Sequence, residues 1–238
     1  MTAFKEEFKF LEDGIDVPFY NDLPKLSIFD WLIVLAAVLL MIGYITVLDI
    51  PNEYLPWAYF LTGVIPALYI CKGNYSLFFK KLKLKDIKLI ILCVIAIYVY
   101  TIAVGAILSS SIGMAAHTDF AESGNLMNII CTIFQVMGEE FFKIFMLLIL
   151  MYVLYKLTGN RNASLAIGLF GSMAIFGLAH YNAYEGRILQ ILLIQGLGSI
   201  FEYYGYLKTK NVWVSYLIHI IRDLIPTALI LLNVVPVT

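Results

Sequence analysis

The sequence predicts an all-α protein, a polytopic bundle of transmembrane helices. Of its 238 residues, 61% are hydrophobic and 14% are charged, whereas a soluble domain is about half apolar and about a quarter charged. The mean hydropathy is +0.87. Apolar runs of about 20 residues, long enough for a helix to cross a bilayer, recur along the chain. We therefore expect the protein to be embedded in a lipid bilayer.

Seven apolar segments alternate with short polar ones, so we expect about seven spans. They run approximately over residues 28–48, 54–71, 87–108, 126–155, 163–182, 188–207 and 212–235. An eighth piece, short or re-entrant, has room between residues 109 and 124. We expect residues 1–27 to form a cytoplasmic or interfacial segment. Residues 28–238 then form a single transmembrane domain, because no internal repeat or long linker divides them.

Basic residues collect in the loops that seven alternating spans place on one side of the membrane. They are Lys5, Lys9, Lys25, Lys72, Lys80, Lys81, Lys83, Lys85, Lys88, Lys156, Arg161, Lys208 and Lys210. The loops on the opposite side carry Arg187 alone. Cytoplasmic loops of membrane proteins are enriched in lysine and arginine, so the N-terminus is predicted to be cytoplasmic. The chain has no basic tract that would suit nucleic acid, and its oligomeric state stays open.

Ionisable residues inside the apolar spans are the candidates for function, because a charge within a bilayer is costly. Most of them lie on three spans: Glu139, Glu140 and Lys143 on span 126–155, His180 with Phe176 on span 163–182, and His219, Arg222 and Asp223 on span 212–235. Residues three or four apart share a helix face, so Lys143 can reach either glutamate. Neighbouring positions lie about 100° apart, so the two glutamates must face different partners. A purely structural ion pair is the alternative.

Depth estimates bring some of these residues together. Spans 126–155 and 163–182 are predicted to form a hairpin that turns at Gly159-Asn160. Counting back from that turn places the two glutamates level with His180, which is a ready acid/base pair. By the same rise, His219 lies only about 10–16 Å from the cytoplasmic side and the glutamates about 30 Å. Either helix tilt or a hairpin that projects into the cytosol would account for this difference. Glu202 either lines the same cavity or meets lipid headgroups.

The three groups, in this order, resemble the motifs of the CAAX protease and bacteriocin-processing (Abi) family. Those motifs are Glu-Glu-x-x-x-Arg, Phe-x-x-x-His and His-x-x-x-Asn/Asp, each on its own span. Here they read Glu139-Glu140-Phe-Phe-Lys-Ile144, Phe176-Gly-Leu-Ala-His180 and His219-Ile-Ile-Arg-Asp223. The arginine position is occupied by Ile144, and Lys143 stands one residue earlier without arginine's forked geometry. The resemblance covers about residues 134 to 224, within a family core that we set at 126–235.

The resemblance implies an intramembrane glutamic endopeptidase. In that interpretation Glu139 activates water, and His180 helps to hold it. Glu140 is a supporting carboxylate oriented by Lys143, and His219 faces the oxyanion. Asp223 either orients His219 or, if protonated, binds the oxyanion itself. The remaining supporting residues are Phe176, Glu202 and Arg222.

The implied substrate is a peptide or protein segment at the membrane. Candidates are a leader peptide, a signalling peptide, a bacteriocin or a prenylated CAAX-like tail, and we expect a multi-pass protein of a prokaryotic cell membrane. A metal-free mechanism is our expectation, and a zinc ion held by Glu139, His180 and His219 is the alternative. Two rival functions remain: a non-catalytic family member that acts as an immunity or scaffold protein, and a small transporter.

Overall fold

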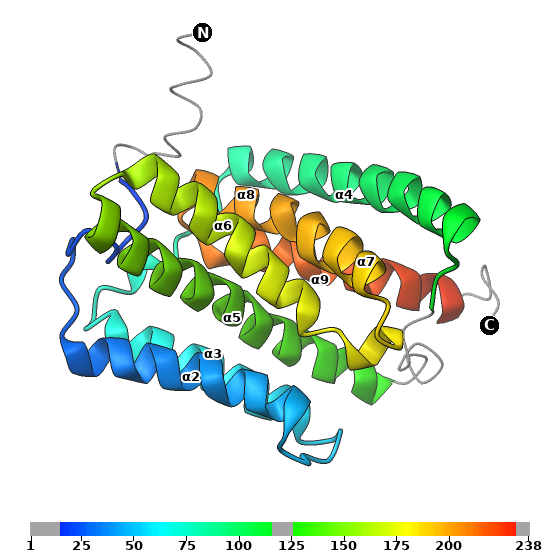
Figure 1. The fold of residues 1–238 in the computed structure, drawn as a ribbon, viewed down its shortest axis with the longest axis horizontal. Coiled ribbons are helices and arrows are strands. Elements are labelled where there is room, and N and C mark those ends of the chain that lie inside the picture. Colours follow the sequence, from blue (N-terminus) through cyan, green and yellow to red (C-terminus); the bar gives the residue numbers. More distant parts are fainter. Residues whose placement is uncertain (1–14, 116–125, 232–238) are drawn as a thin grey trace, which may run out of the picture.

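The computed structural model describes residues 15–115 and 126–231, and within them the chain is a helical bundle without a β-strand (Figure 1). Five helices of this described part are long and apolar enough to cross a membrane. They are α2 (Ile28–Thr46), α4 (Leu84–Ser111), α5 (Leu126–Thr158), α6 (Arg161–Leu178) and α9 (Val212–Leu231). The predicted polytopic helical bundle is thus confirmed.

The other two predicted spans are also helical but less regular. Helix α3 (Leu55–Ile70) has 16 residues and is shorter than the rest. Residues 188–209 do not form the single helix that their hydropathy predicts. They divide into α7 (Ile188–Gln190), a π-helical turn η4 (Ile191–Gly196), a 3₁₀ turn η5 (Leu197–Ser199) and α8 (Ile200–Thr209). Residues 1–14 of the predicted cytoplasmic or interfacial segment lie outside the described residues. So does the proposed eighth piece between residues 109 and 124, apart from the end of α4 and the non-helical residues 112–115.

Close packing against α6 accompanies the irregular segment. A Cβ atom on Gly177 would lie 2.8 Å from the carbonyl oxygen of Ile191, and one on Gly196 would lie 3.0 Å from that of Met173. The backbones of α6 and η4 therefore touch directly. This contact fixes the π turn beside α6, and it sets the position of α8 that follows.

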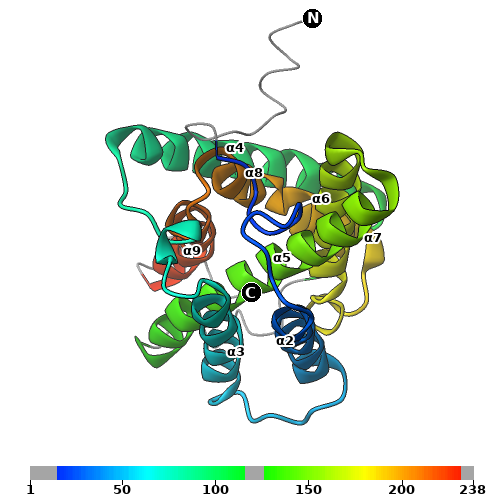
Figure 2. The same ribbon diagram turned by 90° about the vertical axis from the view of Figure 1, so that its left-hand side faces the viewer.

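Helix α5 is the centre of the bundle. It packs against α2, α3, α6 and α9, and Figure 2 shows it crossing the middle of the molecule. The α3 contact is the closest, because a Cβ on Gly138 would lie 2.4 Å from the Tyr59 carbonyl group. On the facing helix, a Cβ on Gly63 would lie 3.0 Å from Phe141 Cβ. The backbone of α3 thus rests on α5 one residue before Glu139.

The α5–α6 hairpin extends beyond the start of α9. Gly159, with φ +62°, makes the turn, and Asn160 caps α6 by accepting a hydrogen bond from the backbone N–H of Ala163. Glu140 lies 18 residues before the end of α5, and His219 lies seven residues after the start of α9. At 1.5 Å per residue these are about 27 and about 10 Å. Since the two side chains are in contact, the hairpin projects past α9. This projection accounts for the difference between the depths estimated from the sequence for His219 and for the two glutamates.

Residues just before α2 cover the projecting end of the hairpin. Asp16 accepts two hydrogen bonds from Arg161, both at 2.6 Å, and a third from the hydroxyl of Tyr20. Burial alone would raise the pKa of the Asp16 carboxyl, but its hydrogen bonds with Arg161 and Tyr20 lower it below the ordinary value. Val17 and Phe19 are buried beside this pair. This part of the N-terminal segment is therefore packed into the bundle.

The contact at Gly138 gives a test of the α3–α5 packing. Gly138→Ala should destabilise the protein by roughly 1–3 kcal/mol, because the new methyl group meets rigid backbone. Thermal unfolding in detergent measures this. Gly105→Ala on α4 is the control, since its Cβ would make ordinary contacts at 3.7 Å and alanine favours helix. Equal stability of the two variants would contradict the packing described.

Candidate active site

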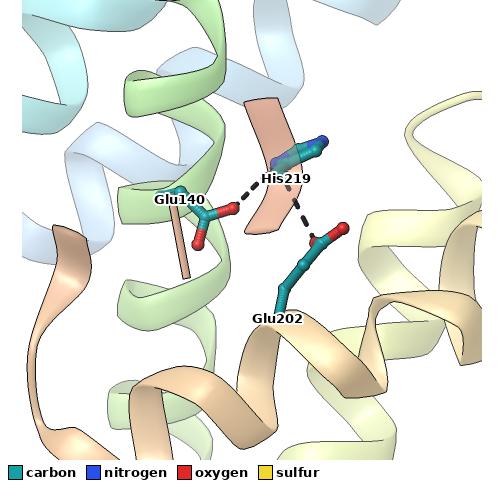
Figure 3. A group of neighbouring side chains, drawn as sticks. All are labelled: Glu140, Glu202 and His219. Atoms are coloured by element: carbon teal, nitrogen blue, oxygen red, sulfur yellow. Dashed lines mark hydrogen bonds and ion pairs between the residues drawn. The ribbon is translucent and has the colours of Figure 1, made fainter. Parts of the chain in front are cut away.

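Three helices contribute to one buried cluster of ionisable side chains. Glu140 comes from α5, Glu202 from α8 and His219 from α9, and Figure 3 shows the three side chains pointing toward one another. His219 Nδ1 lies 2.7 Å from Glu140 Oε1 and 3.9 Å from Glu202 Oε2. None of the three side chains is more than 2% exposed. Segments far apart in the sequence thus meet inside the bundle.

Lys143 supplies a positive charge to this cluster. Its ammonium nitrogen lies 2.5 Å from Glu140 Oε1, and it also pairs with Glu202. The same nitrogen sits over the ring of Phe176, 4.9 Å from its centroid. Ile144, at the arginine position of the family motif, is buried in the apolar core instead. Lysine one residue earlier therefore neutralises Glu140.

Arg222 adds a second cation. Its Nη1 lies 2.7 Å from Glu202 Oε1, and its Nε lies 3.0 Å from Asp223 Oδ1. Charges consequently alternate along a connected series of side chains, in the order Glu140, Lys143, Glu202, Arg222 and Asp223. Alternation matters because a buried charge without a partner costs several kcal/mol. Glu202 belongs to this site and does not meet headgroups.

The two neighbouring glutamates face different partners. Glu140 contacts His219 at Nδ1, whereas Glu139 Oε2 lies 3.7 Å from the opposite nitrogen, Nε2. Glu139 also accepts a hydrogen bond from Gln135 at 2.9 Å, and its side chain is 14% exposed. One carboxylate is therefore sealed in the cluster, while the other is accessible on the far side of the imidazole.

The hydrogen bonds assign the proton on His219. Lys143 already donates to Glu140 Oε1, so that oxygen belongs to a carboxylate and only accepts. Nδ1 of His219, 2.7 Å away, must then donate to it. Nε2 is left facing Glu139 and Asp223, whose Oδ2 lies 3.4 Å away. The nitrogen at the accessible side of the ring is thus the one available for chemistry.

His180 joins the site through Phe176. Its Nδ1 lies 2.9 Å from the carbonyl oxygen of Phe176 and donates to it, which leaves Nε2 as the acceptor nitrogen. The ring of Phe176 contacts both histidines, at 4.9 Å from His180 and 6.1 Å from His219 between centroids. His180 also lies close enough to Asp223 to interact electrostatically. Both histidines therefore lie around the same aromatic ring.

Two further residues at this end of the site were not foreseen. Tyr184 lies 6.5 Å from His180 between ring centroids, and Gln195 donates to its hydroxyl at 2.6 Å. Burial raises the pKa of Tyr184 to about 12 against the opposing charge of Arg222, so its hydroxyl stays protonated. The i, i+4 spacing from His180 was a usable signal, but Tyr184 lies just beyond the span predicted to end at residue 182.

The site offers one compact set of metal-ligand atoms among the described residues. Atoms of Glu140, Glu202 and His219 lie within 4.8 Å of one another. The Lys143 ammonium contacts both carboxylates and already provides the positive charge between them. This set therefore does not suit a divalent cation while Lys143 is protonated. On the accessible side, Glu139 and His219 present an oxygen and a nitrogen 3.7 Å apart.

Comparison with known families finds a match over part of the chain. Residues 121–225 match the family model described as type II CAAX prenyl endopeptidase, Rce1-like. No curated protein and no solved structure matches the chain. The matched region contains every member of the charged series and both histidines. Over that region the chain is similar to the CAAX protease family that its three motifs resemble, a family of proteases.

Proposed function

We propose that this protein is an intramembrane endopeptidase in which Glu139 activates the attacking water. The observation that carries the proposal is the placement of two carboxylates on opposite nitrogens of His219, one sealed and one accessible. A sealed carboxylate fixes the imidazole, and an accessible one can exchange protons with water. A general base must lie within hydrogen-bond reach of the proton that it removes, and we assign that role to Glu139 on the side of Nε2.

The proposed reaction is peptide hydrolysis. Glu139 takes a proton from water while the water oxygen bonds to the carbonyl carbon of the scissile peptide. His180, whose Nε2 is an acceptor, holds the second hydrogen of that water. The carbonyl oxygen becomes an oxyanion. As the intermediate collapses, the C–N bond breaks and Glu139 returns its proton to the departing amine.

His219 stabilises the oxyanion in this scheme. It can donate to the oxyanion only if Nε2 carries a proton, so it acts as an imidazolium with Nδ1 bonded to Glu140. The surrounding carboxylates favour that cation. Asp223 contacts Arg222 at one oxygen and faces His219 Nε2 with the other. Both neighbours suit an ionised acceptor, so its proposed role is to orient His219.

The proposed substrate is a membrane-associated peptide or protein. A leader peptide, a signalling peptide, a bacteriocin and a prenylated CAAX-like tail all fit a site that lies between membrane-spanning helices. The matched family is described as type II CAAX prenyl endopeptidase, which supports the last of these. We place the protein in a prokaryotic cell membrane, with its N-terminus in the cytoplasm.

One observation favours a non-catalytic scaffold or immunity protein. Glu140, Lys143 and Glu202 pair with one another completely inside the bundle, as a purely structural network would. The accessibility of Glu139 favours catalysis instead. A transporter would differ from both in moving ions or substrate across liposomes.

Substitution of Glu139 separates these functions. Glu139→Gln should fold normally and reduce peptide cleavage in proteoliposomes by roughly 10²–10⁴-fold, the contribution of a general base. Glu53→Gln, at an exposed loop position, is the matched control and should cleave like wild type. Wild-type cleavage by Glu139→Gln would contradict the proposed base. A scaffold would be indicated if the wild-type protein shows no peptidase activity and the Glu139→Gln variant keeps partner binding or immunity.

Metal content tests the choice of a metal-free mechanism. Purified protein should contain substoichiometric zinc, and a strong chelator should leave cleavage unchanged, because Lys143 and Arg222 provide the cationic charge. Elemental analysis by mass spectrometry measures the content. A full equivalent of zinc that is lost in His180→Ala would contradict the metal-free mechanism and support the Glu139, His180 and His219 set.

A further inference from the structure

Glu202 is the least exposed carboxylate of the charged series, and both of its oxygens are occupied. Glu202 is 0% exposed. Oε2 pairs with Lys143 of α5, and Oε1 lies 2.7 Å from Arg222 Nη1 of α9. The carboxylate itself belongs to the first turn of α8. Glu202 therefore connects three helices through two ion pairs.

Each cation that Glu202 holds also contacts another carboxylate of the site. Lys143 is shared between Glu202 and Glu140, and Arg222 is shared between Glu202 and Asp223. Glu140 and Asp223 in turn face the two nitrogens of His219. A change at Glu202 therefore reaches both sides of the imidazole, although Glu202 Oε2 lies 3.9 Å from His219 Nδ1.

Two donors share one oxygen of Glu140, and Glu202 keeps them from competing for it. Oε1 of Glu140 accepts from both Lys143, at 2.5 Å, and His219, at 2.7 Å, while the two donor nitrogens lie 3.4 Å apart. Lysine carries a compact charge on a flexible stem. Without the charge of Glu202, Lys143 would be drawn wholly to Glu140 and would compete with His219 for that oxygen. Glu202 thus holds Lys143 where both donors can share Oε1.

The backbone around Glu202 is built to hold this position. The hydroxyl of the next residue, Tyr203, donates to the backbone carbonyl of Lys143 at 3.3 Å, which ties α8 to α5 beside the ion pair. The α6–η4 contact at Gly177 fixes the irregular turns that precede α8. Both features set the height of Glu202 relative to α5.

We propose that Glu202 is a positioning residue of the active site: by holding Lys143 and Arg222 apart, it sets the orientation and hydrogen bonding of His219. This role deepens the proposed endopeptidase function and rests on it for its kinetic consequence. Glu202 touches no reacting atom in the scheme above.

Kinetics give the first test. Glu202→Gln should lower kcat roughly 10²-fold with little change in KM, because misplacement of about 1 Å at a catalytic group costs that much while substrate contacts stay intact. Glu202→Asp keeps the charge but withdraws it by one methylene group, and should give a smaller loss. Glu53→Gln is the matched control. A kcat equal to wild type in Glu202→Gln, or a change confined to KM, would overturn the proposal.

The histidine spectrum gives a second test that needs no substrate. The chain has three histidines, so nitrogen NMR of histidine-labelled protein yields few signals, and His219→Gln assigns the one of interest. The His219 Nδ1 signal should shift in Glu202→Gln, or in Glu202→Asp if the glutamine variant does not fold, and stay constant in Glu53→Gln. An unchanged signal would overturn the proposal. If wild type cleaves nothing, the endopeptidase function fails while this spectrum still decides the role of Glu202.

Discussion

The Lys143 ammonium is the interaction on which the candidate site depends. It pairs with Glu140 on its own helix and with Glu202 on α8, and it rests on the face of Phe176. Two carboxylates buried this completely would repel each other and lose their hydration without a cation between them. With the cation in place, Glu140 can accept from His219 and hold its ring. The chemistry proposed for Glu139 on the other side of that ring follows from this arrangement.

Helix packing brings the lysine to its partners. Glycines permit direct backbone contact of α3 with α5 at Gly138, and of α6 with η4 at Gly177. The first contact lies next to the paired glutamates, and the second lies next to Phe176. The projecting α5–α6 hairpin then lets the middle of α5 meet the beginning of α9. The two glycine contacts and the projecting hairpin each set the position of a helix backbone, and together they bring the charged side chains into contact.

Much of this architecture could be predicted from the sequence. The length of the apolar runs gave the bundle, and motif spacing gave the residues that share a face, because both follow from the regular helical rise and turn. The depth of His219 in the bundle was harder to predict, since it depends on how far α5 and α6 extend beyond α9. Glu202 and Gln195 could not be placed, because the π and 3₁₀ turns between residues 191 and 199 shift the helical phase. Tyr184 was missed because it lies beyond the apolar run.

The most direct test of the central claim is a comparison of thermal unfolding in detergent between a single and a combined variant. Lys143→Met alone should cost about 3–5 kcal/mol or prevent folding, since it leaves buried carboxylates without their cation. Adding Glu140→Gln and Glu202→Gln removes those charges as well and should restore most of the lost stability. Costs that simply add across the three substitutions would contradict the account, because they would show that these side chains do not share one buried network.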